Sequence, residues 1–386
     1  MTQHWHVSPD SIEIAQMPFY WRLSDETTPF PSIAQRLGIR VVADPVYDYL
    51  KFLPSSEQWE VIDAAYRQNE NIGFLNPESG QMQTYGSSVN NFLLSELRRA
   101  QPSQQVVEIG CGAGFSIQFL RQHGFNVLGV DPSEYSLRWS ERLGFRLIND
   151  FFREGLLETL PDFVYCNDVF EHVRDVEKFS AMVHACLADG GTFCFATTNS
   201  TRSIALGDIS MLEHQHVNMF TNRSLALILG KAGFVDINIG DGTYGNTFHV
   251  TAVKRSRGFA PVTAPAAQDE GQFCDGYFER AADRIRAFEQ YYHERQVPHC
   301  YVPLRGIPYL ACVGDYGQAR VFDSNDAWRH KYIDGYVSPI GGLVDIAYSP
   351  GQRFFVASLT FFKEIKTMLM TKGYPEDAVK SIKDLP

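Results

Sequence analysis

The chain lacks the features that define several large classes of protein. No apolar run approaches the roughly 20 residues needed to span a bilayer, and the polar residues 1–6 contain no signal-peptide core, so we expect a cytoplasmic protein. The 7 cysteines are scattered and form no C-x-x-C pair, which argues against a disulfide framework and a zinc knot. Basic residues are in the minority, and a formal net charge of -11 disfavours nucleic-acid and membrane partners.

From Gln105 onward, short apolar runs alternate with helical patterns, which is typical of a mostly parallel sheet covered by helices. The predicted strands are Val106–Ile109, Val127–Val130, Arg146–Ile148, Phe163–Cys166, Thr192–Ala196, Val235–Ile239 and Thr247–Val253. The predicted helices between them include Phe115–Gln122, Glu134–Leu143 and Val176–Leu187. Only a short spacer separates the last two strands, so they should pair antiparallel. The predicted fold class is α/β, with a doubly wound, seven-stranded Rossmann-like sheet.

The length of 386 residues and the 44% of hydrophobic residues indicate a globular protein of two or three domains. The stretch Ser256–Gln272 is rich in small residues and proline and is interpreted as a linker. The predicted segments are an N-terminal extension on the substrate side (1–86), the main α/β domain (87–255), the linker (256–272), and a helix followed by a smaller Rossmann-like domain (273–386).

The most informative segment runs from Val106 to Gly114, a buried strand followed by the turn G-C-G-A-G and a helix. Glycines allow the backbone to approach a ligand closely, and the helix N-terminus offers unpaired N–H groups. Asp131 ends the next strand, where a carboxylate can accept the hydroxyls of a ribose. Phe115 stands where a nicotinamide-binding fingerprint needs its third glycine, which argues against a dehydrogenase.

The series E-x-G-C-G-x-G, V-D-P-S, N-D-F and N-D-V-F-E-H-V resembles class I S-adenosylmethionine-dependent methyltransferases. The resemblance implies S-adenosyl-L-methionine as cofactor and S-adenosyl-L-homocysteine as product. It implies that Glu108 faces the methionine amino end, that Asp150 with Phe151 borders the adenine, and that Asp168 lies near the transferable methyl. The implied cofactor-binding residues are Glu108, Gly110, Cys111, Gly112, Gly114, Asp131, Pro132, Asp150, Phe151, Asn167 and Asp168. Taken singly, each carboxylate could equally be a helix cap or a turn residue.

A second stretch, Glu213–Thr221, resembles the Y-H-E-H-x-x-Y-F-S segment of deoxysugar C-methyltransferases. This resemblance implies His216 as the general base and His214 as a second catalytic candidate, for which packing in a lid is the alternative. Gln215, in place of the family's glutamate, and Tyr85 are expected to contact the substrate. Because Gln215 is uncharged, His216 should keep an ordinary histidine pKa, and the rate should rise through about pH 6–7.

The chain departs from this family in several places. Residues 1–83 contain no cysteine, so the family's zinc module has no metal ligands here. Glu213, Gln215 and Met219 replace residues of the family's segment, which leaves oxygen, nitrogen and carbon acceptors open. The C-terminal unit resembles the family's Rossmann-like domain, and it could bind a nucleotide or be a degenerate scaffold. The sequence shows no dense carboxylate cluster beside the two histidines, so we expect no catalytic metal.

The expected function is methyl transfer to a small polar metabolite in sugar or secondary-metabolite biosynthesis, with a nucleotide-linked sugar as the leading acceptor. One alternative is a non-catalytic subunit that binds S-adenosylmethionine or serves as a scaffold. Another is an enzyme that uses the cofactor site without net methyl transfer. The sequence leaves the oligomeric state open.

Overall fold

The computed structural model describes residues 4–19, 36–68, 80–102, 105–243, 246–255, 273–294, 299–301, 303–313 and 316–385. The predicted linker, Ser256–Gln272, lies outside these residues, so the division into domains stays a prediction. No helix in the described part of the chain is long and apolar enough to cross a membrane.

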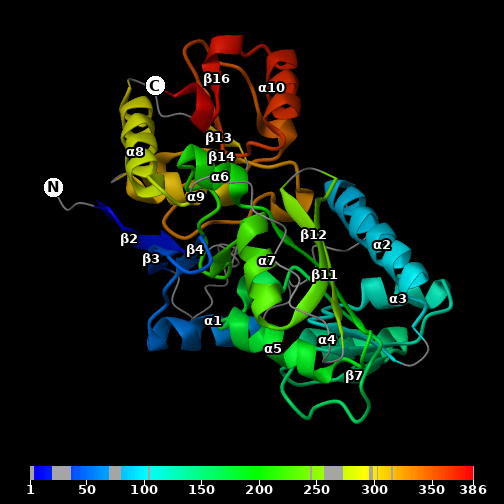
Figure 1. The fold of residues 1–386 in the computed structure, drawn as a ribbon. Coiled ribbons are helices and arrows are strands. Elements are labelled where there is room, and N and C mark those ends of the chain that lie inside the picture. The colour runs from blue at the N-terminus through cyan, green and yellow to red at the C-terminus, as the bar shows by residue number, and fades with distance from the viewer. Residues whose placement is uncertain are drawn as a thin grey trace.

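A seven-stranded sheet with the order β11-β12-β9-β8-β5-β6-β7 forms the centre of the molecule (Figure 1). Its strands are β5 (Val106–Ile109), β6 (Val127–Val130), β7 (Arg146–Ile148), β8 (Phe163–Asn167), β9 (Thr192–Thr198), β11 (Phe234–Asp241) and β12 (Thr247–Lys254). Strands β5 to β9 pair in parallel, whereas β12 is antiparallel to both β9 and β11. The predicted fold class and the C-terminal hairpin of this sheet are confirmed.

Helices cover both faces of this sheet, so its central strands are buried on both sides. On β5, Val106 packs with α2 and α3, whereas its neighbour Val107 packs on the other face with α5 and α7. The helices of this region are α2 (Gly80–Ala100), α3 (Phe115–Gln122), α4 (Glu134–Leu143), α5 (Val176–Cys186), α6 (Thr201–Leu206) and α7 (Asn222–Lys231), with the 3-10 helix η1 (Phe170–His172). The predicted boundary at residue 87 falls inside α2.

The N-terminal segment forms an antiparallel sheet that takes its fifth strand from the central region. This sheet contains β1 (Trp5–Ser8), β2 (Ser11–Pro18), β3 (Arg36–Asp44), β4 (Tyr49–Phe52) and β10 (Asn218–Met219), and α1 (Ser56–Gln68) follows it. Strand β10 pairs with β4 through Asn218 and Lys51. The pairing fixes the preceding loop, which contains His216, against the N-terminal sheet.

The C-terminal segment contains a second parallel sheet, with the order β14-β13-β15-β16. Its elements are α8 (Tyr277–His293), β13 (His299–Tyr301), α9 (Pro303–Cys312), η2 (Tyr316–Gln318), β14 (Val321–Phe322), η3 (Asp326–Trp328), η4 (Leu343–Asp345), β15 (Phe354–Val356), α10 (Phe362–Thr371), η5 (Glu376–Ala378), β16 (Val379–Lys380) and η6 (Ile382–Asp384).

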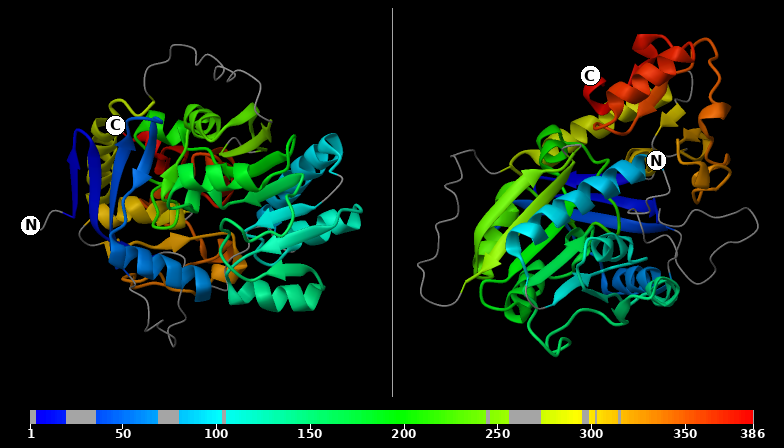
Figure 2. Two further views of the ribbon diagram at one scale, coloured as in Figure 1. Left: turned by 60° about the horizontal axis from the view of Figure 1, so that its bottom comes forward. Right: turned by 90° about the vertical axis from the view of Figure 1, so that its right-hand side faces the viewer.

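The two terminal segments pack against each other, and Figure 2 shows the blue N-terminal strands beside the yellow α8. Ile12 and Ile14 of β2 share one hydrophobic cluster with Tyr292 of α8 and Tyr309 of α9. The Nε1–H of Trp5 donates a hydrogen bond to Glu289 at 2.8 Å. The N-terminal and C-terminal segments therefore share one hydrophobic core.

Candidate active site

A cavity of about 1410 Å³ opens at the carboxyl ends of the central strands. Its lining comes from the glycine-rich turn, from η1, from the loop containing Gln215 and His216, and from the C-terminal segment. Ligands of open α/β sheets bind at this edge of the sheet.

The glycine-rich turn after β5 has a backbone that only glycine adopts readily. The φ angles of Gly110, Gly112 and Gly114 are 72°, 49° and 72°, in the left-handed region. A Cβ on Gly110 would lie 2.4 Å from Cγ2 of Val169. Gly110 and Gly112 line the cavity, whereas Gly114 caps the start of α3 and is not among the lining residues.

Asp131 lies at the end of β6 and is only 4% exposed. Its carboxylate accepts hydrogen bonds from the Gly112 N–H at 2.9 Å, from the Ser133 N–H at 2.9 Å and from the Ser133 hydroxyl at 2.7 Å. An ionised carboxylate has about four acceptor sites, so these bonds orient the group and leave capacity for a ligand hydroxyl. Pro132 lines the cavity beside it, and both positions fit the predicted ribose site.

Three further predicted cofactor residues line the cavity, namely Glu108, Cys111 and Asn167. Glu108 accepts a hydrogen bond from the Tyr165 hydroxyl at 3.0 Å, and burial is the main cause that raises its pKa well above the usual range. The side-chain oxygen and nitrogen of Asn167 are buried without a hydrogen-bond partner among the described residues. Such atoms suit a polar ligand, because leaving them unpaired is costly.

Of the two residues predicted to border the adenine, only one lines the cavity. Phe151 lines it, and the Arg67 guanidinium lies 4.8 Å from the centre of the Phe151 ring. Asp150 is not a lining residue; its carboxylate accepts from the Phe151 N–H at 2.8 Å and pairs with Arg153 at 3.2 Å. Asp150 therefore shapes this turn, and the structure does not bring it to the cavity.

The two predicted catalytic histidines lie in different surroundings. His214 is 1% exposed, its Nε2 lies 3.0 Å from the carbonyl oxygen of Leu37, and its ring contacts Phe19 and Phe52. Burial lowers its pKa to about 4. His214 does not line the cavity, so the structure places it in the packing beneath the N-terminal sheet and away from the site where a base would act.

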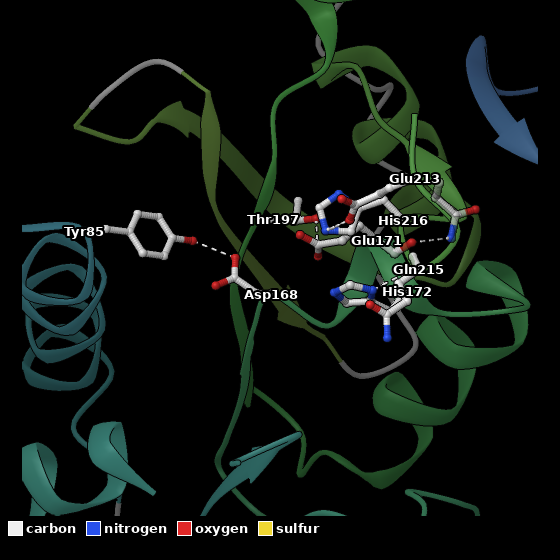
Figure 3. A network of polar contacts seen from close by, with 9 residues as sticks. Tyr85, Asp168, Glu171, His172, Thr197, Glu213, Gln215 and His216 are labelled. Atoms are coloured by element: carbon white, nitrogen blue, oxygen red, sulfur yellow. Dashed lines mark hydrogen bonds and ion pairs between the residues drawn. The ribbon is translucent and has the colours of Figure 1, made fainter. Parts of the chain in front are cut away.

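His216 lines the cavity and forms an ion pair with Glu213, whose Oε1 lies 2.7 Å from its Nε2 (Figure 3). Burial alone would lower the pKa of His216, but the carboxylates of Glu213 and Glu171 outweigh it and raise the pKa above the ordinary value. The expectation of an ordinary histidine pKa is therefore wrong. Gln215 is uncharged, but Glu213 supplies the carboxylate that raises the pKa of His216.

The predicted substrate residues Tyr85 and Gln215 also line the cavity. The Tyr85 hydroxyl donates to Oδ1 of Asp168 at 2.6 Å, and Figure 3 shows this pair apart from the His216 and Glu171 side chains. Asp168 has a φ of 51°, and burial, followed by the charge of Glu171, raises its pKa to about 7. The Gln215 side chain is 2% exposed, and its backbone carbonyl lies 2.8 Å from Nδ1 of His172.

Known proteins match the central part of this chain. A family model described as a methyltransferase domain matches residues 81–239. The human mitochondrial ubiquinone biosynthesis O-methyltransferase is 28% identical over 138 residues, which are 31% of this chain and 37% of that protein. The C-methyltransferase NovU of Streptomyces niveus is 27% identical over 172 residues, which are 42% of this chain and 38% of NovU. The chain thus spans less than half the length of either relative.

Among solved structures, the geranyl diphosphate C-methyltransferase from Streptomyces coelicolor A3(2) is similar, with 17% identity over 52% of this chain and 98% of that chain. Its TM-score of 0.42 is too low to support a functional argument. The matched family model, the order of the sequence motifs and the strand order of the central sheet all indicate the same kind of domain. Residues 81–239 are a class I S-adenosylmethionine-dependent methyltransferase domain. The domain has the fold that binds S-adenosylmethionine.

Sequence reasoning missed two polar residues of the methyltransferase domain, Glu171 and His172 of η1. Glu171 is fully buried and accepts from the Thr197 hydroxyl at 2.8 Å, while its other oxygen has no partner among the described residues. Burial and the neighbouring His216 lower the pKa of His172 to about 3. Both residues belong to the N-D-V-F-E-H-V motif, so their place directly after β8 was the available signal.

Glu171, His172 and His216 each offer a metal-ligand atom, and these atoms lie within 4.8 Å of one another. The expectation of no metal rested on the absence of a dense carboxylate cluster beside His214 and His216 in the sequence. In the folded chain Glu171 supplies that carboxylate from η1, so these three residues of the methyltransferase domain could hold a divalent cation.

Proposed function

We propose that the protein transfers the methyl group of S-adenosylmethionine to a small polar metabolite, with a nucleotide-linked sugar as the acceptor class. The observation that carries the proposal is His216, which lines the same cavity as the glycine-rich turn and is paired with Glu213 at 2.7 Å. The resemblance of its loop to deoxysugar C-methyltransferases supports the acceptor class.

The residues at the end of the cavity near the glycine-rich turn fit the cofactor. Gly110 and Gly112 would allow the backbone to approach it, Asp131 would accept ribose hydroxyls, and Asn167 would pair its unpartnered atoms with the methionine part. When bound, the cofactor supplies a methyl group that is already activated as a sulfonium. The chain then has to align the acceptor with that methyl and exclude water.

At the acceptor end, His216 is the group we assign as general base. Its unprotonated imidazole would take a proton from the acceptor, and the Glu213 carboxylate would stabilise the imidazolium that results. Glu171 adds a second negative charge near the same ring. Tyr85 donates to Asp168 at 2.6 Å, which holds both side chains in place at the cavity wall.

Turnover of a defined acceptor panel tests this function. The full chain is incubated with S-adenosylmethionine and each of a set of nucleotide-linked sugars, and S-adenosylhomocysteine and methylated product are measured by mass spectrometry. We expect acceptor-dependent formation of both in equal amounts. Cofactor binding without turnover on the panel would favour a non-catalytic role, and cofactor consumption without a methylated product would favour different chemistry.

A further inference from the structure

Glu171, His172 and His216 form a compact polar cluster in the wall of the cavity. Each offers one metal-ligand atom, these atoms lie within 4.8 Å of one another, and Figure 3 shows the three side chains side by side. Two of the residues belong to η1, whereas His216 lies in the loop before β10, so the fold brings them together. The proposed reaction uses His216 as the base and gives His172 no part.

The hydrogen bond of His172 decides which of its ring nitrogens is free. Its Nδ1 lies 2.8 Å from the backbone carbonyl oxygen of Gln215. A carbonyl oxygen only accepts hydrogen bonds, so Nδ1 carries the hydrogen of the neutral ring and Nε2 keeps its lone pair. Histidines that bind metals almost always donate their other N–H in this way, which fixes the orientation of the ring.

His216 has the corresponding arrangement with a carboxylate. Its Nε2 is paired with Glu213 at 2.7 Å, and Glu213 is only 3% exposed. The pairing leaves Nδ1 as the ring nitrogen that can bind a proton or a cation. A carboxylate on the far nitrogen of an imidazole also makes the near nitrogen a stronger metal ligand. Both rings are therefore held by one nitrogen and keep the other for a ligand.

Glu171 completes the donor set with an oxygen that lacks a partner. It is fully buried, and one oxygen accepts from the Thr197 hydroxyl at 2.8 Å. The other oxygen, Oε1, is buried with no hydrogen-bond partner among the residues that the structure describes, which is costly. Two imidazoles and one carboxylate are a donor set of zinc sites that keep a fourth position open. The charges of Glu171 and Glu213 together balance a divalent cation.

We propose that Glu171, His172 and His216 bind a divalent transition-metal cation, with Zn²⁺ as the best match for the donors, and that the bound cation switches off methyl transfer. An imidazole nitrogen that holds a cation has no lone pair left for the proton of the acceptor. The cation and that proton therefore compete for Nδ1 of His216. The switch rests on the proposed function, in which His216 is the base, but the binding of the cation does not.

Metal binding is tested with the metal alone. The full chain is treated with a chelator, dialysed and titrated with Co²⁺, whose visible absorption reports its ligands, and Zn²⁺ is then added to displace it. We expect one Co²⁺ per chain and its displacement by Zn²⁺, with calorimetry giving the Zn²⁺ affinity.

Two variants each remove one ligand. His172→Asn removes Nε2, but its amide can still donate to the Gln215 carbonyl, and Glu171→Gln replaces the carboxylate by a neutral amide. Each should weaken Co²⁺ by more than the about 10–100-fold that the loss of a residue behind a ligand typically costs. Should Glu171→Gln not fold, His172→Asn decides.

Two further variants serve as controls. Glu213→Gln keeps all three ligands and removes the charge behind His216, so it should weaken Co²⁺ by about 10–100-fold. His293→Ala removes an exposed histidine at the end of α8 and should leave the affinity unchanged. Every variant should bind S-adenosylhomocysteine within about twofold of wild type, which verifies folding.

The switch is tested by methyl transfer at rising concentrations of buffered Zn²⁺. Wild type should lose turnover with a midpoint near the Zn²⁺ affinity from calorimetry, and a chelator should restore it. His172→Asn, compared with its own metal-free rate, should need at least about 10-fold more Zn²⁺. Zn²⁺ that only bound the phosphates of an acceptor would inhibit wild type and His172→Asn alike, and this result would overturn the switch.

The outcomes separate this inference from the proposed function. If no Co²⁺ spectrum appears, or if His172→Asn binds Co²⁺ as tightly as wild type, the site is overturned while methyl transfer stands. If the cation binds through these residues and turnover is unchanged or faster, the switch is overturned and the site stands. If the cation binds and nothing on the acceptor panel is methylated, the proposed function fails, the switch fails with it, and the site stands.

Discussion

The two ends of the cavity are built in different ways. At the glycine-rich end, the groups come from consecutive strand ends of one sheet, and backbone geometry fixes them, as with Gly110 and the Gly112 N–H that bonds Asp131. At the His216 end, side chains from segments far apart in sequence meet, including Glu171, Glu213 and Arg305. The first end is suited to a constant ligand, and the second can change its specificity by exchanging side chains without disturbing the sheet.

The sharpest way to test this division is to remove the base. His216→Ala should lower turnover by about 10²–10⁴-fold and leave S-adenosylhomocysteine affinity nearly unchanged, because the imidazole acts only on the acceptor proton. Steady-state kinetics and calorimetry measure the two effects, and His123→Ala, which removes an exposed histidine of the same domain, is the control. Unaltered turnover would show that His216 only packs the loop, and a large loss of cofactor affinity would show that the two ends are not independent.

The reciprocal change is made at the other end. Asp131→Ala should weaken S-adenosylhomocysteine by about 1–3 kcal/mol, since it removes a charged acceptor for ribose hydroxyls and leaves the Gly112 N–H without its partner. Calorimetry measures the change, and Asp189→Ala, at an exposed turn, provides the matched control. Equal affinity in wild type and Asp131→Ala would contradict the assignment of the ribose site.

Two glycines with similar backbone angles separate strain from steric contact. Gly110→Ala and Gly124→Ala both place a side chain at positive φ, 72° and 88°, which costs about 1–2 kcal/mol of folding free energy. Only the first also brings a Cβ to 2.4 Å from Val169, whereas nothing lies within 4 Å at Gly124. Urea unfolding should therefore show the larger loss for Gly110→Ala, and only that variant should lose S-adenosylhomocysteine affinity. Identical behaviour would mean that backbone angle alone matters at the turn.

The same contrast explains what the sequence could predict. Strand periodicity and glycine stops locate the strands of the central sheet within two residues at each end, because these signals are local. The residues that meet at the strand ends follow from topology, and it was the family resemblance that assigned Asp131 and Asn167 to one cofactor site. The His216 loop has no period, so sequence could not show that Glu213 faces His216 while His214 faces Leu37, or that β10 joins the N-terminal sheet.

The charge on Glu213 gives the most selective test of the His216 end. His216 must be unprotonated to act as a base, and its pKa is raised above the ordinary histidine value of 6.5, so wild-type kcat/KM should rise with pH through a midpoint above 6.5. Glu213→Gln should move that midpoint down. Glu171 also raises the pKa of His216 and is present in both proteins. Asp168, with a pKa of about 7, adds its own step to the pH profile. The step that belongs to His216 is therefore identified by the difference between Glu213→Gln and wild type.

The protonation of His216 should also affect the stability of the folded protein, with the opposite dependence on pH. A raised histidine pKa stabilises the folded state fully below the unfolded value near 6.5, and this contribution is lost as pH rises through the folded pKa. Glu213→Gln should therefore lower the melting temperature more at pH 6 than at pH 9, whereas Glu141→Gln, on the exposed surface of α4, should change neither the profile nor the melting temperature.

A rate profile that is flat while chemistry is rate-limiting would show that alignment alone drives transfer. An unchanged midpoint in Glu213→Gln would show that the ion pair does not tune the base, and the difference between the two ends of the cavity would then rest on packing alone.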